Sequence, residues 1–281
     1  MQNMRDIRRH INTIKIIQKE TKVMKAVYAA KLSKTQAKLQ AARPYADKLK
    51  EVLARLMAAG ADFQHELVEQ KSAARIAYVI FTGNRGMAGS YSADVCSFAE
   101  KVIEEKGLES QLFIIGKKGR DYFRNRSYAD FRQFVTLGEE PDYDEAEGLA
   151  QEIIKPFVSG QVREVILIYT PYFTPVRNQP LRDTFLPLSR KAAMEGRSGS
   201  QTEYLYEPGT GEVLNCLLLR YLQIYVYKAM LEAKASEHAA RLATVGAAAD
   251  NAEEMIRDLT LSYNRAHQAM ITREITEITK P

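Results

Sequence analysis

The last quarter of the chain, residues 212–279, repeats apolar or amphipathic side chains at alternating steps of four and three residues, with Lys228 and His238 as the exceptions. The repeat occupies Leu217, Tyr221, Ile224, Lys228, Leu231, Ala235, His238, Leu242, Val245, Ala249, Ala252, Ile256, Leu259, Tyr263, Ala266 and Met270. No proline interrupts the stretch, and Gly246 is its only glycine. A spacing of 3.5 residues held over so many heptads predicts a coiled-coil helix, roughly 100 Å long at ~1.5 Å per residue. One compact domain cannot cover such a helix, so most of it needs a partner.

The first sixty residues carry the same repeat and offer that partner. Its positions are Ile7, Ile11, Ile14, Ile17, Thr21, Met24, Tyr28, Leu32, Thr35, Leu39, Ala42, Ala46, Leu49, Leu53 and Leu56. Two such seams at opposite ends of the chain predict that the terminal helices pair antiparallel within one molecule. The pattern leaves one alternative open, in which each helix serves separately for homodimerisation.

The middle of the chain changes to a different period. Short apolar runs predict buried strands at 75–82, 111–116 and 163–170, with a further strand expected at 131–137. Helical stretches alternate with them at 92–106, 117–126 and 142–158. Proline-broken residues 172–188 suggest hairpin or edge strands, 191–201 a Gly/Ser linker, and 203–207 one more strand. The alternation predicts an α/β domain with a mainly parallel sheet. We expect three parts: an N-terminal coiled-coil helix over 1–60, the central α/β domain over 61–208 and a C-terminal coiled-coil helix over 209–281.

The net charge of +5 is unevenly distributed. Residues 1–60 hold fourteen lysines and arginines against four acidic residues, whereas the remaining residues are net negative. A basic helix favours an acidic partner, which could be nucleic acid, an anionic membrane surface or an acidic protein segment. A solvated helix face explains the same charges without any partner.

Hydropathy and cysteine usage indicate the cellular compartment of the chain. No apolar run approaches the ~18 residues that a membrane span requires. The first thirty residues are charged throughout, so we expect no signal peptide and a cytosolic or membrane-peripheral protein. Cys96 and Cys216 have neither CxxC nor metal-like spacing, and we interpret both as packing residues.

The motifs that would carry catalysis fail their stricter tests. The loop Gly83-Asn84-Arg85-Gly86-Met87-Ala88-Gly89 lies between a predicted strand and a predicted helix, but it is not GxGxxG. Residues 116–119 contain lysines without the P-loop spacing, and the four histidines are scattered. We therefore predict no catalytic residues, no cofactor and no metal.

Both ends of the chain resemble the gamma subunit of F-type ATP synthase, of the bacterial type. The matching segments are Met4–Ile11, Thr21–Val27, Ala29–Leu32, Arg43–Ala46, Leu231–Arg241, Asp250–Ala252, Leu259–Ala266 and Ile271–Ile278. The resemblance covers both predicted rods and the order of helix, α/β domain and helix.

The resemblance implies a central rotor shaft with no active site of its own. Such a shaft couples ion-driven rotation of a membrane ring of c subunits to ATP synthesis, or the reverse, in a catalytic head of alpha and beta subunits. It also implies contact with the epsilon subunit and a peripheral place at the cytoplasmic face of the cell membrane, with protons or sodium as the coupling ion. The alternative from another class is a homodimeric basic coiled-coil scaffold that binds nucleic acid, although no recognisable reading module is present.

Five residues gain a role through the resemblance. Lys22 and Met24 match the family's segment that faces the catalytic subunits, and His267, Gln268 and Thr272 match the terminal contact with one of them. His267 stands where the family has arginine, which removes a permanent charge and a bidentate fork and could make the contact depend on pH. The family's Asp-Arg-Gly loop reads Asn84-Arg85-Gly86 here, and its Gly-Ala tail and the cysteine pair of its plastid branch are missing.

Overall fold

The computed structural model describes residues 4–59, 65–107, 109–126, 128, 130–134, 140–172, 179–188 and 210–279. Two compact units can be distinguished, one formed by Met1–Lys31 with Arg241–Pro281 and the other by Leu32–Ala240. Helices α1 (Met4–Ala59) and α6 (Thr210–Ile278) each contribute to both units. The predicted boundaries at residues 60 and 208 fall outside the described residues, so the three-part division stays a prediction.

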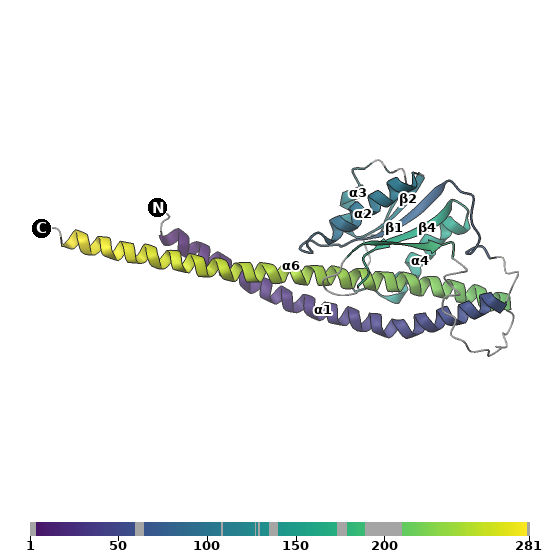
Figure 1. Ribbon diagram of the computed structural model, residues 1–281, viewed down its shortest axis with the longest axis horizontal. Coiled ribbons are helices and arrows are strands. Elements are labelled where there is room, and N and C mark those ends of the chain that lie inside the picture. The colour runs from purple at the N-terminus through teal and green to yellow at the C-terminus, as the bar shows by residue number, and fades with distance from the viewer. Residues whose placement is uncertain are drawn as a thin grey trace. The chain divides into compact units, whose positions relative to one another are not determined.

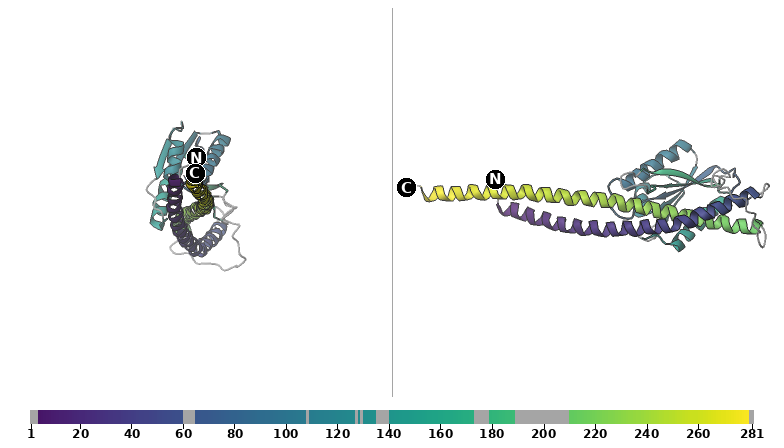
Figure 2. Two further views of the ribbon diagram at one scale, coloured as in Figure 1. Left: turned by 90° about the vertical axis from the view of Figure 1, so that its left-hand side faces the viewer. Right: turned by 60° about the horizontal axis from the view of Figure 1, so that its bottom comes forward.

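In the first unit, α1 and α6 lie side by side and run antiparallel (Figures 1 and 2). The guanidinium of Arg241 lies 4.9 Å from the centre of the Tyr28 ring. Further along, a Cβ on Gly246 would lie 3.8 Å from the Lys25 side chain. Residue numbers therefore rise on one helix as they fall on the other, which confirms the predicted intramolecular pair.

The predicted seam is largely the buried face of this pair. Ile7, Thr21 and Tyr28 are buried on α1, and Val245, Ala249 and Ala252 are buried on α6. Two positions were wrong: Ile17 and Met270 are 45% and 42% exposed, and Gln18 takes the half-buried place beside Ile17. After Ile14 the buried face of α1 continues four residues later, at Gln18, and not three residues later, at Ile17. The sequence spacing alone does not show whether a given step is of three or of four residues.

The second unit contains a five-stranded sheet in the order β3-β2-β1-β4-β5. Its strands are β1 (Arg75–Phe81), β2 (Glu109–Ile115), β3 (Asp130–Phe134), β4 (Val162–Tyr169) and β5 (Leu181–Leu186). The first four are parallel, and β5 pairs antiparallel with β4. The mainly parallel sheet is confirmed. The predicted strand at 203–207, the linker at 191–201 and the end of the strand predicted to reach Leu137 lie outside the described residues.

Helices cover both faces of the sheet (Figure 1). Helices α4 (Tyr143–Val158) and α6 pack on one face, and α2 (Tyr91–Lys106) and α3 (Lys117–Phe123) pack on the other. This burial on two faces explains why β1 and β4 read as continuous apolar runs rather than as alternating patterns. The sequence placed the end of α3 three residues too far along, at Arg126.

The two cysteines differ in environment. Cys96 is buried in α2, as expected, but Cys216 is exposed on α6, so its interpretation as a packing residue was wrong. Cys216 lies between the buried Leu214 and Leu218 and therefore points away from the face that they share. Among the described helices, none is both long and apolar enough to cross a membrane.

Candidate functional site

The residues predicted on α1 lie on the pair of helices in the first unit. Lys22 is exposed, and Met24 is half-buried in the seam. Lys22 lies near Glu253 of α6, which also accepts a 2.8 Å hydrogen bond from Arg257 Nη2. That hydrogen bond, the Arg257 charge and the Lys22 charge together lower the pKa of Glu253. Lys22 is thus available to an outside partner, whereas Met24 supports the packing of the two helices.

The residues predicted on α6 lie close to its end. His267, Gln268 and Thr272 are all exposed. The His267 ring stacks on Tyr263, with 6.2 Å between ring centres and 20° between planes. Thr272 Oγ1 donates a 2.9 Å hydrogen bond to the carbonyl of Gln268, one helical turn earlier. The three side chains therefore occupy consecutive turns at the tip of α6.

The structure does not bring the two groups together. Glu253, which is the α6 neighbour of Lys22, and His267 are fourteen residues apart, or about 20 Å at ~1.5 Å per residue of helix. Lys22 and Met24 thus belong to one surface, and the tip of α6 forms another.

An apolar stripe on the tip of α6 was missed by sequence reasoning. The α6 helix extends beyond the described start of α1 (Figures 1 and 2). Ile271, Ile275 and Ile278 are 40%, 56% and 82% exposed, and they stand at positions i, i+4 and i+7 of the helix. This spacing places them on one side of α6. The i, i+4, i+7 spacing was visible in the sequence, but the sequence did not show that the described part of α1 ends short of these residues. A contiguous exposed apolar stripe marks a surface for another protein.

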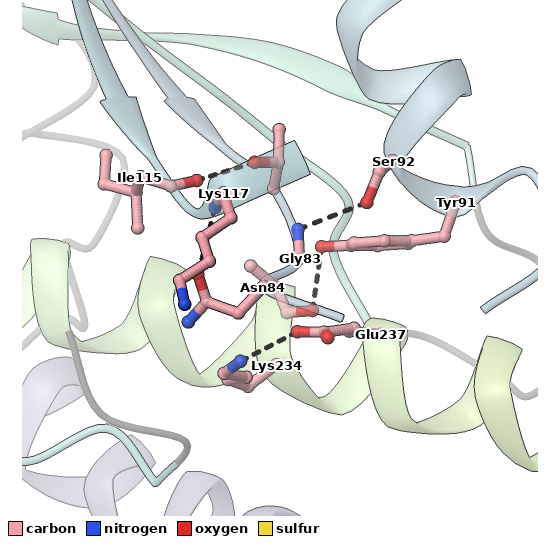
Figure 3. A network of polar contacts seen from close by, with 10 residues as sticks. Gly83, Asn84, Tyr91, Ser92, Ile115, Lys117, Lys234 and Glu237 are labelled. Carbon is pink, nitrogen blue, oxygen red and sulfur yellow. Dashed lines mark hydrogen bonds and ion pairs between the residues drawn. The ribbon is translucent and has the colours of Figure 1, made fainter. Parts of the chain in front are cut away.

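A second site lies in the other unit, where the glycine-rich loop after β1 meets α6 (Figure 3). Lys234 Nζ and Glu237 Oε2 are 2.8 Å apart, and their side chains are only 13% and 4% exposed. The loop packs directly on this ion pair, because a Cβ on Gly83 would lie 2.9 Å from Glu237 Oε1.

Hydrogen bonds fix the loop and α2 to the same place. Tyr91 Oη donates to the carbonyl of Ala233 at 2.9 Å. The backbone N–H of Gly83 donates to Ser92 Oγ at 3.2 Å, and Asn84 Oδ1 accepts from the N–H of Lys117 at 3.0 Å (Figure 3). We call the Gly83 loop, Tyr91, Lys234 and Glu237 the joint.

The joint occupies the crevice where open α/β sheets usually bind ligands. That crevice lies at the carboxyl ends of the strands where the strand order reverses, here between β1 and β4. Residues of α6 line this point together with Phe81 and Thr82, and the remaining cavity is about 30 Å³. This volume suits water rather than a nucleotide. The helix itself fills the crevice, which argues against nucleotide binding by the glycine-rich loop.

Beside the end of β4, α6 buries another carboxyl group. Glu232 is 7% exposed and lies 3.7 Å from Lys228 Nζ. Burial raises the pKa of Glu232, and the charges of Lys228 and Arg43 partly offset this effect. Burial also raises the pKa of Tyr169, which hydrogen-bonds to Glu232. The ends of β1 and β4, between which the strand order reverses, therefore both lie against polar groups of α6.

Comparison with known proteins agrees with the sequence and the fold. The chain matches the family profile described as ATP synthase over residues 3–280. It is 41% identical over 278 residues to the ATP synthase gamma chain of Desulfitobacterium hafniense, covering 99% of this chain and 97% of the relative. The gamma chain of Moorella thermoacetica is 42% identical with the same coverage.

Solved structures share the fold at low sequence identity. A rotor of the Euglena gracilis mitochondrial ATP synthase has a TM-score of 0.63 at 16% identity, covering 95% of this chain and 98% of that chain. A central stalk and c-ring of the Tetrahymena thermophila enzyme has a TM-score of 0.60 at 19% identity, covering 81% and 98%. Nothing in these matches supports the alternative of a nucleic-acid scaffold. The chain belongs to the ATP synthase gamma-chain family, the subunits that form the rotor shaft of F-type ATP synthases.

Proposed function

We propose that this shaft couples rotation of a membrane ring of c subunits to ATP synthesis, or the reverse, in a head of alpha and beta subunits. The observation that carries the proposal is the antiparallel pair of α1 and α6, in which α6 extends beyond the described part of α1. A single asymmetric rod contacts chemically equivalent catalytic sites differently. Such differential contact is what makes equivalent sites unequal in affinity. In this role the chain itself carries no active site.

Two surfaces of the first unit would meet the head. The exposed, basic side of α1 around Lys22 suits an acidic segment of the catalytic subunits, and Met24 supports that side from the seam. An exposed charge contact is weak and screened by salt, so it allows sliding during rotation. At the tip, His267, Gln268 and Thr272 would hold a catalytic subunit, while the stripe of Ile271, Ile275 and Ile278 would lie against an apolar surface of the head.

The joint would carry torque between the α/β domain and α6. Besides the joint itself, Tyr143 Oη donates to Gln223 Oε1 of α6 at 2.9 Å, and Tyr225 of α6 hydrogen-bonds Asp183 of β5. The domain also holds α1, through a 2.7 Å hydrogen bond between Gln36 Nε2 and Tyr172 Oη. Because these contacts come from different strands and helices, α6 cannot turn about its own axis without breaking several of them.

The remaining partners follow from the same assignment. We propose that the α/β domain faces the epsilon subunit and the c-ring, and that the assembly lies at the cytoplasmic face of the cell membrane with this chain peripheral to it. We propose also that the functional parts divide as the sequence predicts, at residues 60 and 208.

The test is to tag this chain in its own cell and extract membranes in mild detergent. We expect a large assembly that hydrolyses ATP and contains one copy of the chain with alpha, beta, epsilon and c subunits. The purified chain alone should hydrolyse no ATP. A small soluble homodimer without ATPase activity would contradict the proposal, and so would ATP turnover by the isolated chain.

A further inference from the structure

A pocket lies between the end of α3 and the edge strand β3. Its volume is about 390 Å³, and it is lined by Arg120, Phe123, Arg124, Arg126, Tyr128, Phe131 and Gln133. Pockets that hold small organic ligands measure roughly 300–1,000 Å³. Its aromatic residues pack with α2 and α3 on one face of the sheet. Helix α4 and most of the buried α6 residues of this unit pack on the other face. The lining of the pocket shares no residue with the joint.

The apolar side of the pocket is built from packed aromatic rings. Phe123 is 1% exposed, and its ring meets that of Tyr128 edge to face, with 5.7 Å between centres. Phe131 is half-buried against the same cluster. A flat or apolar part of a ligand would find a preformed surface there.

One of the three arginines is held in place before any ligand arrives. Arg126 Nε donates to Glu100 Oε1 at 2.5 Å, and Arg126 Nη1 donates to the carbonyl of Tyr122 at 2.6 Å. The guanidinium also lies over the Tyr122 ring, 3.7 Å from its centre. A cation fixed by three contacts loses little conformational entropy when it binds an anion.

The lining carries three positive charges and no carboxylate. Asp121 and Glu100 pair with Arg120 and Arg126 from outside the lining. Arg124 is exposed and forms no ion pair with any residue in the described part of the chain. Guanidinium groups bind phosphate oxygens with paired, charge-assisted hydrogen bonds.

We propose that this pocket binds a small ligand that carries a phosphate group. The guanidinium groups of Arg120, Arg124 and Arg126 would contact the phosphate oxygens, and the organic part would lie against Tyr128 and Phe131. Burial raises the pKa of Tyr128, so its hydroxyl stays protonated at neutral pH and remains a hydrogen-bond donor. A free phosphorylated metabolite and a phospholipid headgroup share this chemistry, and the experiment separates them.

The full-length chain is titrated with inorganic pyrophosphate and with ADP by calorimetry, and separately with vesicles of phosphatidylcholine containing phosphatidic acid. Arg124→Gln tests the pocket. The matched control is Arg132→Gln, because Arg132 is also exposed and lies on β3, yet is not part of the lining. Both variants remove one positive charge. Gln133→Ala is a second pocket variant, and circular dichroism melting confirms that each variant folds.

We expect saturable binding of pyrophosphate or ADP that Arg124→Gln weakens about ten- to a hundredfold, the effect of losing a hydrogen bond to a charged group. Arg132→Gln should change the affinity less than about twofold, as a screened surface charge would. Binding to the vesicles alone, with the same dependence on Arg124, would identify a headgroup as the source of the phosphate. No saturable binding to any of the probes, or equal weakening by both arginine variants, would overturn the proposal.

Discussion

Gly83 and Glu237 meet so closely that a single methyl group on Gly83 would lie 2.9 Å from the Glu237 carboxylate. Glu237 is buried on α6, and Gly83 begins the loop that leaves β1. The glycine is therefore explained by a helix that the loop must approach, rather than by a phosphate that the loop must cradle. This contact fixes the long helix to the sheet at the point where related open sheets bind ligands.

Gly83→Ala should lower stability and weaken coupling. The added methyl group pushes the Glu237 carboxylate away from Lys234, and overpacking of this kind costs about 1–3 kcal/mol. Thermal unfolding of the purified chain measures the loss. Gly86→Ala is the matched control in the same loop, because nothing lies within 4 Å of a Cβ there. Equal melting temperatures for Gly83→Ala and the native chain would show that the contact carries no strain.

Glu237→Gln should be more destabilising than a similar change in an exposed pair. Removing this charge leaves Lys234, whose side chain is 13% exposed, without its carboxylate, at a cost of about 2 kcal/mol. Glu253→Gln is the control, since Glu253 pairs with Arg257 at the surface and its loss should lower the melting temperature only slightly. In the assembled enzyme, Glu237→Gln should also lower ion pumping per ATP hydrolysed. Unchanged ion pumping per ATP in a folded variant would show that the joint does not transmit torque.

The raised pKa of Glu232 should be visible in the pH dependence of the chain's thermal stability. Its pKa is raised by burial, so the folded chain binds more protons than the unfolded chain between the ordinary pKa of 4.5 and the higher folded pKa. Stability from this group is present below 4.5 and is lost as the pH rises through the folded pKa. The melting temperature of Glu232→Gln relative to the native chain should therefore increase between about pH 4 and pH 7.

Glu253 serves as the control, because its contribution to stability should change with pH in the opposite direction. Its lowered pKa means that its contribution is present above 4.5 and is lost as the pH falls through the folded pKa. The relative melting temperature of Glu253→Gln should thus decrease slightly with rising pH. The same slope for both variants would contradict the assignment of opposite pKa directions.

His267→Arg should strengthen the contact of the α6 tip with the head. Arginine adds a permanent charge and a planar fork at an exposed position, and we expect dissociation of the shaft from the head to slow about two- to tenfold. The gain should shrink at high salt. His10→Arg adds the same group at an exposed position on α1 and should have no such effect. Slower dissociation in both variants would mean that added charge, rather than the tip contact, is responsible.

The sequence was sufficient for the helices and the central strands, because a seam every 3.5 residues and a continuous apolar run each report directly which faces are buried. It placed Ile17 and Met270 in the buried seam, although both are exposed, and it assigned the exposed Cys216 to the packed interior. A regular 3.5-residue spacing does not record the exact phase of a real helix. The joint could not be predicted, because Tyr91 and Ala233 are 142 residues apart in sequence and no local pattern records their contact. The partner roles of Lys22, Met24, His267, Gln268 and Thr272 remain predictions.

Rotation of this chain inside the head is the direct test of its role as a shaft. Cys216 is exposed on α6 while Cys96 is buried, so a thiol-reactive probe can be attached to Cys216 alone. The chain is assembled with the alpha and beta subunits of its own cell, the head is fixed to a surface, and ATP is added. We expect continuous rotation of the probe in one direction, dependent on ATP. A stationary probe on assemblies that still hydrolyse ATP would contradict it.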